Sequence, residues 1–229
     1  MEKFNQNEFN DFIITKGIIG IKDKPFKLKS GRESYFYFNW RNVAEDVYNM
    51  EMFTDYIIQF VNDKGLQPRC FYGIPAGATK AAIITQYKWA MGQLDFCEGA
   101  YPLPLGREVP KEHGDPKDKF FVGEPKGDVV ILEDVTTTGA SLIKGVDQLL
   151  ESKLKILAAI GFTNRNEKDA RGKSVEESLK EKNVAYYAMS NALETLPKYV
   201  NGLKEKPKEE VLRNIEDEFK QFGTQEINW

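Results

Sequence analysis

Residues 129–141 read Val-Val-Ile-Leu-Glu-Asp-Val-Thr-Thr-Thr-Gly-Ala-Ser, a buried-strand pattern followed by a turn of acids, hydroxyls and small residues. An apolar helical pattern follows at residues 142–150. In an open α/β sheet, such a strand delivers its last residues to the carboxyl edge, where ligands bind. This stretch therefore predicts a strand, a ligand-binding turn and a helix, in that order.

The turn has the chemistry of a phosphate site beside a sugar site. Backbone N–H groups, the hydroxyls of residues 136–138 and Ser141, and the positive end of the following helix can together surround a phosphate. Carboxylates such as Glu133 and Asp134 suit ribose hydroxyls or a hydrated Mg²⁺. A simple helix cap is the alternative, but a cap needs only one hydroxyl. We therefore expect the turn to bind a phosphorylated ribose.

The segments on both sides alternate between short apolar runs and helical patterns. We predict strands at residues 69–74, 128–134, 155–162 and 184–188, and helices at residues 8–16, 46–62, 80–91, 142–150, 175–182 and 207–222. This alternation predicts an α/β fold with a mostly parallel central sheet flanked by helices. Aromatic runs at residues 26–28 and 35–38 flank a Ser-Gly turn and predict a separate small hairpin.

Residues 102–123 form a long, highly charged segment that proline and glycine interrupt and that has no apolar period. A loop of this length inside a compact domain is more often functional than accidental. The guanidinium, ammonium and imidazole groups of Arg107, Lys111 and His113 could close over an anionic leaving group. Taken alone, the same residues also fit a solvated charged loop.

Composition is that of an ordinary globular protein and argues against several classes of function. The 229 residues carry a net charge of −3, which gives no overall attraction to nucleic acid or anionic membranes. No run approaches the roughly 20 apolar residues of a membrane span, and residues 1–7 do not read as a secretory signal. Two cysteines without CxxC spacing and a single histidine argue against a zinc site. We expect a cytoplasmic protein with reduced thiols.

The stretch at residues 129–141 resembles the phosphoribosyl diphosphate (PRPP) signature of the type I phosphoribosyltransferases. In that family, the two acids hold the ribose hydroxyls and the turn holds the 5′-phosphate. The resemblance implies the fold of this family, with a small N-terminal hood hairpin and a long mobile catalytic loop. It also implies PRPP binding by Lys80, Glu133, Asp134, Thr136, Thr137, Thr138, Gly139, Ala140 and Ser141.

Residues 26–39 resemble the N-terminal Leu-Lys-Ser-Gly-Arg-x-Ser segment of the orotate phosphoribosyltransferase branch. The resemblance implies that Lys29 reaches the active site and that Tyr37 and Phe38 line the base pocket. Flat aromatic walls suit a pyrimidine ring, and a lysine suits an anionic ligand. Without the resemblance, a plain hairpin with core aromatics would be the default interpretation.

Two further segments resemble the same branch. Residues 107–114 match its mobile loop Arg-Lys-x-x-Lys-x-His-Gly, with Glu108 where many relatives carry a second lysine. Arg165 follows the strand at residues 155–162 and corresponds to the arginine that grips the orotate carboxylate. Asn164 stands in place of the usual aspartate. The resemblance runs from about residue 9 to residue 196.

The resemblance implies an enzyme that converts PRPP and orotate to orotidine 5′-monophosphate and pyrophosphate in pyrimidine synthesis. Mg²⁺ is the expected cofactor, held mainly by PRPP and water rather than by a direct protein ligand. The implied catalytic residues are Lys29, Arg107, Lys111, His113 and Asp134. Relatives act as homodimers whose mobile loop reaches the neighbouring site, and association with orotidine monophosphate decarboxylase is a further hypothesis. Neither nucleic acid nor membrane is an expected partner.

Two other functions stay open from the sequence: transfer to another base, and a non-catalytic regulator that senses PRPP. The cations of the loop favour the enzyme over the regulator. We expect one phosphoribosyltransferase domain over residues 1–229, with a hood region at 1–45, the mobile loop at 102–123 and a C-terminal helical extension at 200–229. No pattern in that extension indicates a function.

Overall fold

The computed structural model describes residues 3–28, 30–113 and 119–229. A four-stranded sheet in the order β3-β6-β7-β8 lies at its centre, and each neighbouring pair of strands is parallel. The strands are β3 (Cys70–Gly73), β6 (Asp128–Thr136), β7 (Lys155–Asn164) and β8 (Tyr186–Ala188). The predicted α/β fold with a parallel central sheet is confirmed.

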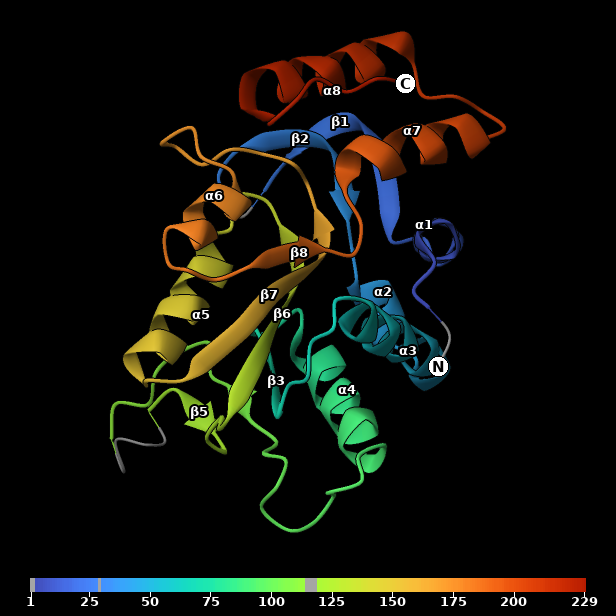
Figure 1. The fold of residues 1–229 in the computed structure, drawn as a ribbon. Coiled ribbons are helices and arrows are strands. Elements are labelled where there is room, and N and C mark those ends of the chain that lie inside the picture. The colour runs from blue at the N-terminus through green and yellow to red at the C-terminus, as the bar shows by residue number, and fades with distance from the viewer. Residues whose placement is uncertain (1–2, 29, 114–118) are drawn as a thin grey trace.

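Helices cover both faces of the sheet (Figure 1). Side chains alternate along a strand, so Val130 and Leu132 of β6 enter one core cluster while Val129 and Ile131 enter another. The first cluster includes side chains from α3 (Val47–Asp63) and α4 (Thr79–Met91), and the second from α5 (Ala140–Glu151) and α6 (Val175–Lys180). Burial on both faces explains why the strands read as continuous apolar runs.

The hood hairpin is longer than its aromatic runs predict. Strand β1 (Ile19–Lys27) pairs antiparallel with β2 (Glu33–Phe38), and its register shifts between Ile21 and Phe26. The shift falls in a polar stretch that interrupts the apolar pattern, which is why the run predicted at residues 26–28 includes only the last two residues of β1. Two helices flank the hairpin in the chain, α1 (Gln6–Thr15) before it and α2 (Arg41–Ala44) after it.

The C-terminal segment covers the hood hairpin. Helices α7 (Ala192–Gly202) and α8 (Glu209–Phe222) lie beside β1 and β2 (Figure 1). Phe219 of α8 stacks on Phe36 of β2 with ring centroids 5.6 Å apart. After α8, Gly223 forms an isolated antiparallel bridge with Glu167, just beyond the end of β7. The extension therefore ties the hairpin to the central sheet.

The long loop contains regular structure, although its sequence had predicted none. Strands β4 (Leu105–Gly106) and β5 (Phe121–Val122) pair antiparallel and close its base. The Lys111 N–H donates to the Lys119 carbonyl at 2.8 Å and extends this pairing. Within the described residues, no helix combines the length and apolar character that a membrane crossing requires.

Candidate active site

The carboxyl edge of the sheet contains a cavity of about 370 Å³ around the end of β6. All nine residues from 133 to 141 line it. The opposite walls come from the hood turn, α2, the turn between β3 and α4, and the long loop, and they consist of Ser30, Arg41, Pro75, Ala76, Gly77 and Glu108. The cavity thus brings together Glu133, Asp134, Thr136, Thr137, Thr138, Gly139, Ala140 and Ser141, as predicted for the PRPP turn.

Gly139 gives the turn its shape. Its φ is +75°, and a Cβ at this position would lie 2.7 Å from the Val175 Cγ2 atom. Both constraints favour glycine, because other residues rarely adopt this φ and their side chains would clash with α6. Gly139 is also the N-cap of α5, so the free N–H groups of the first helical turn lie beside the cavity. This arrangement suits an anion.

The carboxylate of Asp134 lies against the backbone of Gly77. A Cβ on Gly77 would overlap the Asp134 carboxylate, so the turn between β3 and α4 can lie this close to the acid only because residue 77 has no side chain. The Val135 N–H donates to Asp134 Oδ1 at 2.9 Å and fixes the carboxylate from the other side. Glu133 is buried, with 6% of its surface exposed. The two acids therefore differ in environment, and Asp134 is the one nearer the neighbouring turn.

The hydroxyl of Thr136 is not available to a phosphate. Thr136 is buried, and its Oγ1 lies 2.5 Å from the Tyr186 hydroxyl of β8. Burial raises the pKa of Tyr186, so this phenol stays protonated. The sequence predicted three consecutive threonine hydroxyls around the phosphate, but only Thr137 and Thr138 of the three are free of this contact. The local pattern could not reveal a partner 50 residues away.

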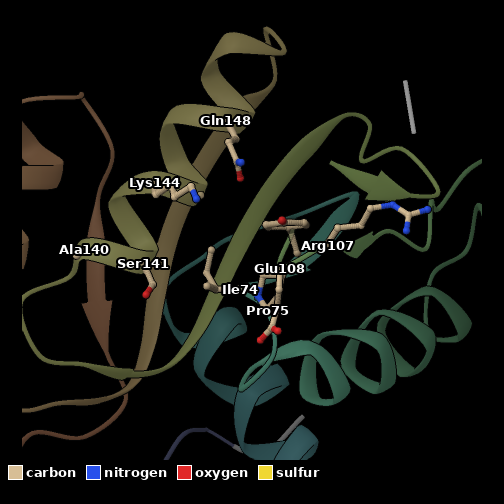
Figure 2. A pocket seen from close by; sticks show the side chains of 10 residues that line it. Ile74, Pro75, Arg107, Glu108, Ala140, Ser141, Lys144 and Gln148 are labelled. Carbon is tan, nitrogen blue, oxygen red and sulfur yellow. The ribbon is translucent and has the colours of Figure 1, made fainter. Parts of the chain in front are cut away.

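A second cavity, of about 470 Å³, adjoins the first and shares Pro75, Glu108, Ala140 and Ser141 with it. Lys144 and Gln148 of α5 face its interior across from β3 (Figure 2). Tyr72 also lines it, and burial raises the pKa of this tyrosine to about 12. Lys144 was not predicted from the sequence, although it lies one helical turn after Ala140 and Ser141 and could have been found from that spacing.

The long loop brings only part of its predicted set to the cavities. Arg107 and Glu108 line the second cavity, and the Arg107 side chain extends away from α5 (Figure 2). Lys111 and His113 are exposed, and neither is among the lining residues of the two cavities. The structure therefore does not bring Lys111 and His113 to the turn at residues 133–141 of this chain.

Lys80 also differs from its predicted placement. Its ammonium group donates to the Ala44 carbonyl at 2.9 Å, and the side chain does not line either cavity. The helix that carries it starts at Thr79, so Lys80 points toward the end of α2 instead. Arg41, which the sequence analysis missed, lines the first cavity from α2. Its position, three residues after the aromatic run of the hairpin, is the signal that could have indicated it.

Of the acceptor residues predicted in the hood, the structure describes Tyr37 and Phe38. Lys29 lies outside the described residues, while its neighbour Ser30 lines the first cavity. Phe38 is 8% exposed and packs edge-on against Phe36 in the core. Tyr37 faces the other side of the strand, where its ring meets Phe26 at 6.1 Å. Neither aromatic lines the two cavities, so their role in base binding stays a prediction.

The guanidinium of Arg165 is not open to a ligand in the way its predicted contact with the orotate carboxylate requires. Its side chain is buried, with 1% of the residue exposed, and its ion pairs run to Glu167 at 2.6 Å and to Glu218 at 2.9 Å. The guanidinium also lies 3.9 Å from the centre of the Phe36 ring. In this arrangement protein carboxylates already hold the planar fork that was predicted to bind the substrate carboxylate. The sequence could not show this because Glu218 is 53 residues away.

Comparison with protein-family models gave no match. Among curated proteins, the chain is 30% identical to an orotate phosphoribosyltransferase of Bradyrhizobium diazoefficiens over 148 residues, which cover 61% of this chain and 73% of the relative. It is 25% identical to the enzyme of the same name from Erwinia tasmaniensis over 210 residues, covering 88% of this chain and 90% of the relative.

A solved structure shows the same fold at lower identity. The crystal structure of orotate phosphoribosyltransferase from Francisella tularensis superposes with a TM-score of 0.66 and 20% sequence identity. The superposition covers 95% of this chain and 100% of the Francisella chain. The parallel sheet and its flanking helices therefore have the architecture of a type I phosphoribosyltransferase.

Proposed function

The chain belongs to the orotate phosphoribosyltransferase family, and we propose that it transfers the phosphoribosyl group of PRPP to orotate, releasing pyrophosphate, in pyrimidine biosynthesis. The observation that carries this proposal is the cavity at the carboxyl edge of the sheet. One continuous segment, from the end of β6 to the start of α5, supplies two acids, two free threonine hydroxyls and a helix N-terminus to it. A phosphate and a ribose diol are the ligands that this combination suits.

In this proposal, PRPP lies along the turn. The N–H groups at the start of α5, with the hydroxyls of Thr137, Thr138 and Ser141, bind the 5′-phosphate. Glu133 and Asp134 accept hydrogen bonds from the ribose hydroxyls. The pyrophosphate extends toward the turn between β3 and α4, where backbone N–H groups at Ala76 and Gly77 can donate to it.

The reaction needs no protein nucleophile. The bond between C1 of the ribose and the pyrophosphate oxygen breaks, and the bonding electrons leave with pyrophosphate. A ring nitrogen of the anionic pyrimidine supplies the electron pair of the new bond to C1. The chain then contributes positioning and charge stabilisation. We assign the stabilisation of the leaving group to Arg41 and Arg107, which line the two adjoining cavities.

Mg²⁺ fits this site as a partner of the substrate. Among the residues described, no group of three or more His, Cys, Asp or Glu side chains could hold a metal ion by itself. Glu133 and Asp134 supply carboxylates to the cavity, and PRPP and water would supply the remaining oxygen ligands that Mg²⁺ prefers. When bound, the ion neutralises the charge that develops on pyrophosphate.

We propose a homodimer in which Lys111 and His113 act at the site of the neighbouring subunit. Both residues are exposed and lie outside the cavities of their own subunit. A run of exposed apolar side chains on α4 and the segment after it, formed by Tyr87, Met91, Leu94, Phe96 and Leu103, supports a contact between subunits. Such patches commonly mark interaction surfaces. Association with orotidine monophosphate decarboxylase and a cytoplasmic location remain hypotheses.

For the acceptor, we keep Lys29, Tyr37 and Phe38 as the hood residues expected to meet orotate. The purified protein, incubated with PRPP and Mg²⁺, should consume orotate but not adenine, hypoxanthine or uracil, measured by the loss of each base. Turnover of another base would contradict the acceptor and leave the donor site intact. Binding of PRPP without consumption of any base would instead indicate a PRPP-sensing regulator.

A further inference from the structure

A buried set of polar side chains joins three parts of the fold. We call Ser34, Arg165, Glu167 and Glu218 the Arg165 cluster; they come from β2, the end of β7 and α8. None of the four is more than 8% exposed. Glu218 is the only charged residue on the buried face of α8, where Val211, Ile215 and Phe219 are its apolar neighbours. Burying a charged side chain costs free energy unless it is paired, so the hydrogen-bond partners of Glu218 indicate its role.

Glu218 holds two groups at once. Its Oε1 accepts from Arg165 Nη2 at 2.9 Å, and its Oε2 accepts from the Ser34 hydroxyl at 3.0 Å. Arg165 Nη2 also donates to Ser34 Oγ at 2.9 Å, so each of the three side chains is hydrogen-bonded to the other two. Because the Glu218 carboxylate bonds both partners, removing it takes one hydrogen-bond partner from the guanidinium and one from the hydroxyl at the same time.

Arg165 connects this arrangement to both walls of the first cavity. Its Nη1 donates to the Phe36 carbonyl at 3.0 Å, which fixes strand β2 of the hood hairpin. Its backbone N–H donates to the Thr136 carbonyl at 2.9 Å, within the turn proposed to bind PRPP. The hairpin contributes Ser30 to the cavity, and the turn contributes residues 133–141. One residue therefore links these two walls directly.

The cluster is braced on its other side by Glu167. The Arg165 Nε–H donates to Glu167 Oε1 at 2.6 Å, while Arg32 of the hood donates to Glu167 Oε2 at 3.0 Å. Arg32 and Arg165 thus share one carboxylate, and Glu218 supplies the second that balances their charge. Without Glu218, the single carboxylate of Glu167 would remain beside two guanidinium groups in a mostly buried position.

We propose that Glu218 is a positioning residue of the transfer reaction, which acts through Arg165 and Ser34 to hold the hood hairpin where the acceptor base meets the ribose. The inference rests on the proposed function and gives the C-terminal helix a part in acceptor binding. It also accounts for the burial of the Arg165 guanidinium between protein carboxylates, since Arg165 then acts by holding the hairpin instead of binding the substrate. The hydrogen bonds of Glu218 reach the hairpin and Arg165 rather than residues 137–141, so the acceptor should depend on Glu218 more than the donor does.

The test is the split between the two Michaelis constants in variants of α8. Glu218→Ala is expected to raise KM for orotate about tenfold, the loss of one buried charged hydrogen bond, with KM for PRPP changed less than about twofold. Glu218→Gln keeps an acceptor oxygen in the same place and should recover much of this loss. If Glu218→Ala does not fold, Ser34→Ala carries the same measurement, because it removes the hydroxyl that bonds both Glu218 and Arg165 and should likewise raise KM for orotate more than KM for PRPP.

Two controls separate positioning from stability. Ile215→Val lowers the melting temperature through the same helix without touching the Arg165 cluster, and Glu209→Gln alters an exposed ion pair with Arg213. Both should leave the two Michaelis constants unchanged. Wild-type values of KM for orotate in Glu218→Ala, or in Ser34→Ala if that variant has to replace it, would overturn the proposal, and so would an equal rise of KM for orotate in Ile215→Val. Failure of the wild-type protein to use orotate would instead overturn the proposed function, and this proposal with it.

Discussion

At Gly77, a position without a side chain allows the backbone of one turn to touch the carboxylate of another. We predict that Gly77→Ala displaces Asp134 and lowers kcat/KM for PRPP by about 10²-fold, because a shift of about 1 Å at a reacting centre has this effect. Steady-state kinetics measure it. Gly202→Ala is the matched control, since a Cβ there meets no atom within 4 Å. Wild-type kinetics in Gly77→Ala would show that the contact is unimportant.

The sequence predicted residues well where local order decides their place. Residues 133–141 line one cavity because a strand, a turn and a helix are consecutive in the chain. The sequence did not predict the contacts of a side chain whose direction is decided by a distant segment. Thr136 turns to Tyr186, Arg165 turns to Glu218, and Lys80 turns to Ala44. Single-sequence patterns contain no information about such partners.

At the level of elements, the burial of Glu218 on α8 makes stability depend on pH. Burial raises the pKa of Glu218 from 4.5 to about 7, against the opposing effects of Arg165 and the Ser34 hydroxyl and with the support of the Glu167 charge. A raised pKa in the folded state means that the contribution of this group is fully present below pH 4.5. It is lost as pH rises through about 7.

We therefore predict that the free energy of unfolding of the wild type, relative to Glu218→Gln, falls between pH 4.5 and pH 8. The fall is on the order of 3 kcal/mol, since one pKa unit corresponds to about 1.4 kcal/mol. Urea unfolding at several pH values measures it, with Glu209→Gln as the control that should follow the wild type. A difference between wild type and Glu218→Gln that does not vary with pH would contradict the assignment.

Elements with a long regular period were predicted, and irregular ones were not. The strands of the central sheet and the helix α8 lie close to their predicted positions, because apolar runs and helical spacing mark them. Helix α7 was missed, and Pro197 inside it is a signal that ordinarily ends a helix. Helix α2 has only four residues, too few to show a period. Strands β4 and β5 have two residues each, and their pairing across the loop has no local signature.

At the scale of the whole molecule, the exposed loop residues and the exposed apolar side chains between residues 87 and 103 lead to a prediction about two subunits. A mixture of Lys111→Ala chains with Asp134→Asn chains should regain up to about a quarter of wild-type activity, because half of the dimers would be mixed and each would hold one intact site. Each variant alone should be nearly inactive. The measurement is orotate consumption after the two proteins are unfolded and refolded together.

Refolding each variant alone provides the control for that experiment. No recovery in the mixture, with each chain correctly folded, would indicate that Lys111 acts within its own subunit. In that case the loop would have to move toward residues 133–141 of the same chain, since neither cavity includes Lys111 in the present arrangement.

Orotate absorbance in the presence of PRPP and Mg²⁺, followed for the wild type and for Asp134→Asn, tests whether the acids and hydroxyls at residues 133–141 hold PRPP for transfer to orotate. We predict that the wild type consumes orotate and releases one pyrophosphate for each molecule consumed, and that Asp134→Asn is slower by about 10²-fold or more. Equal rates in the two proteins, or no loss of orotate with correctly folded wild type, would contradict the account.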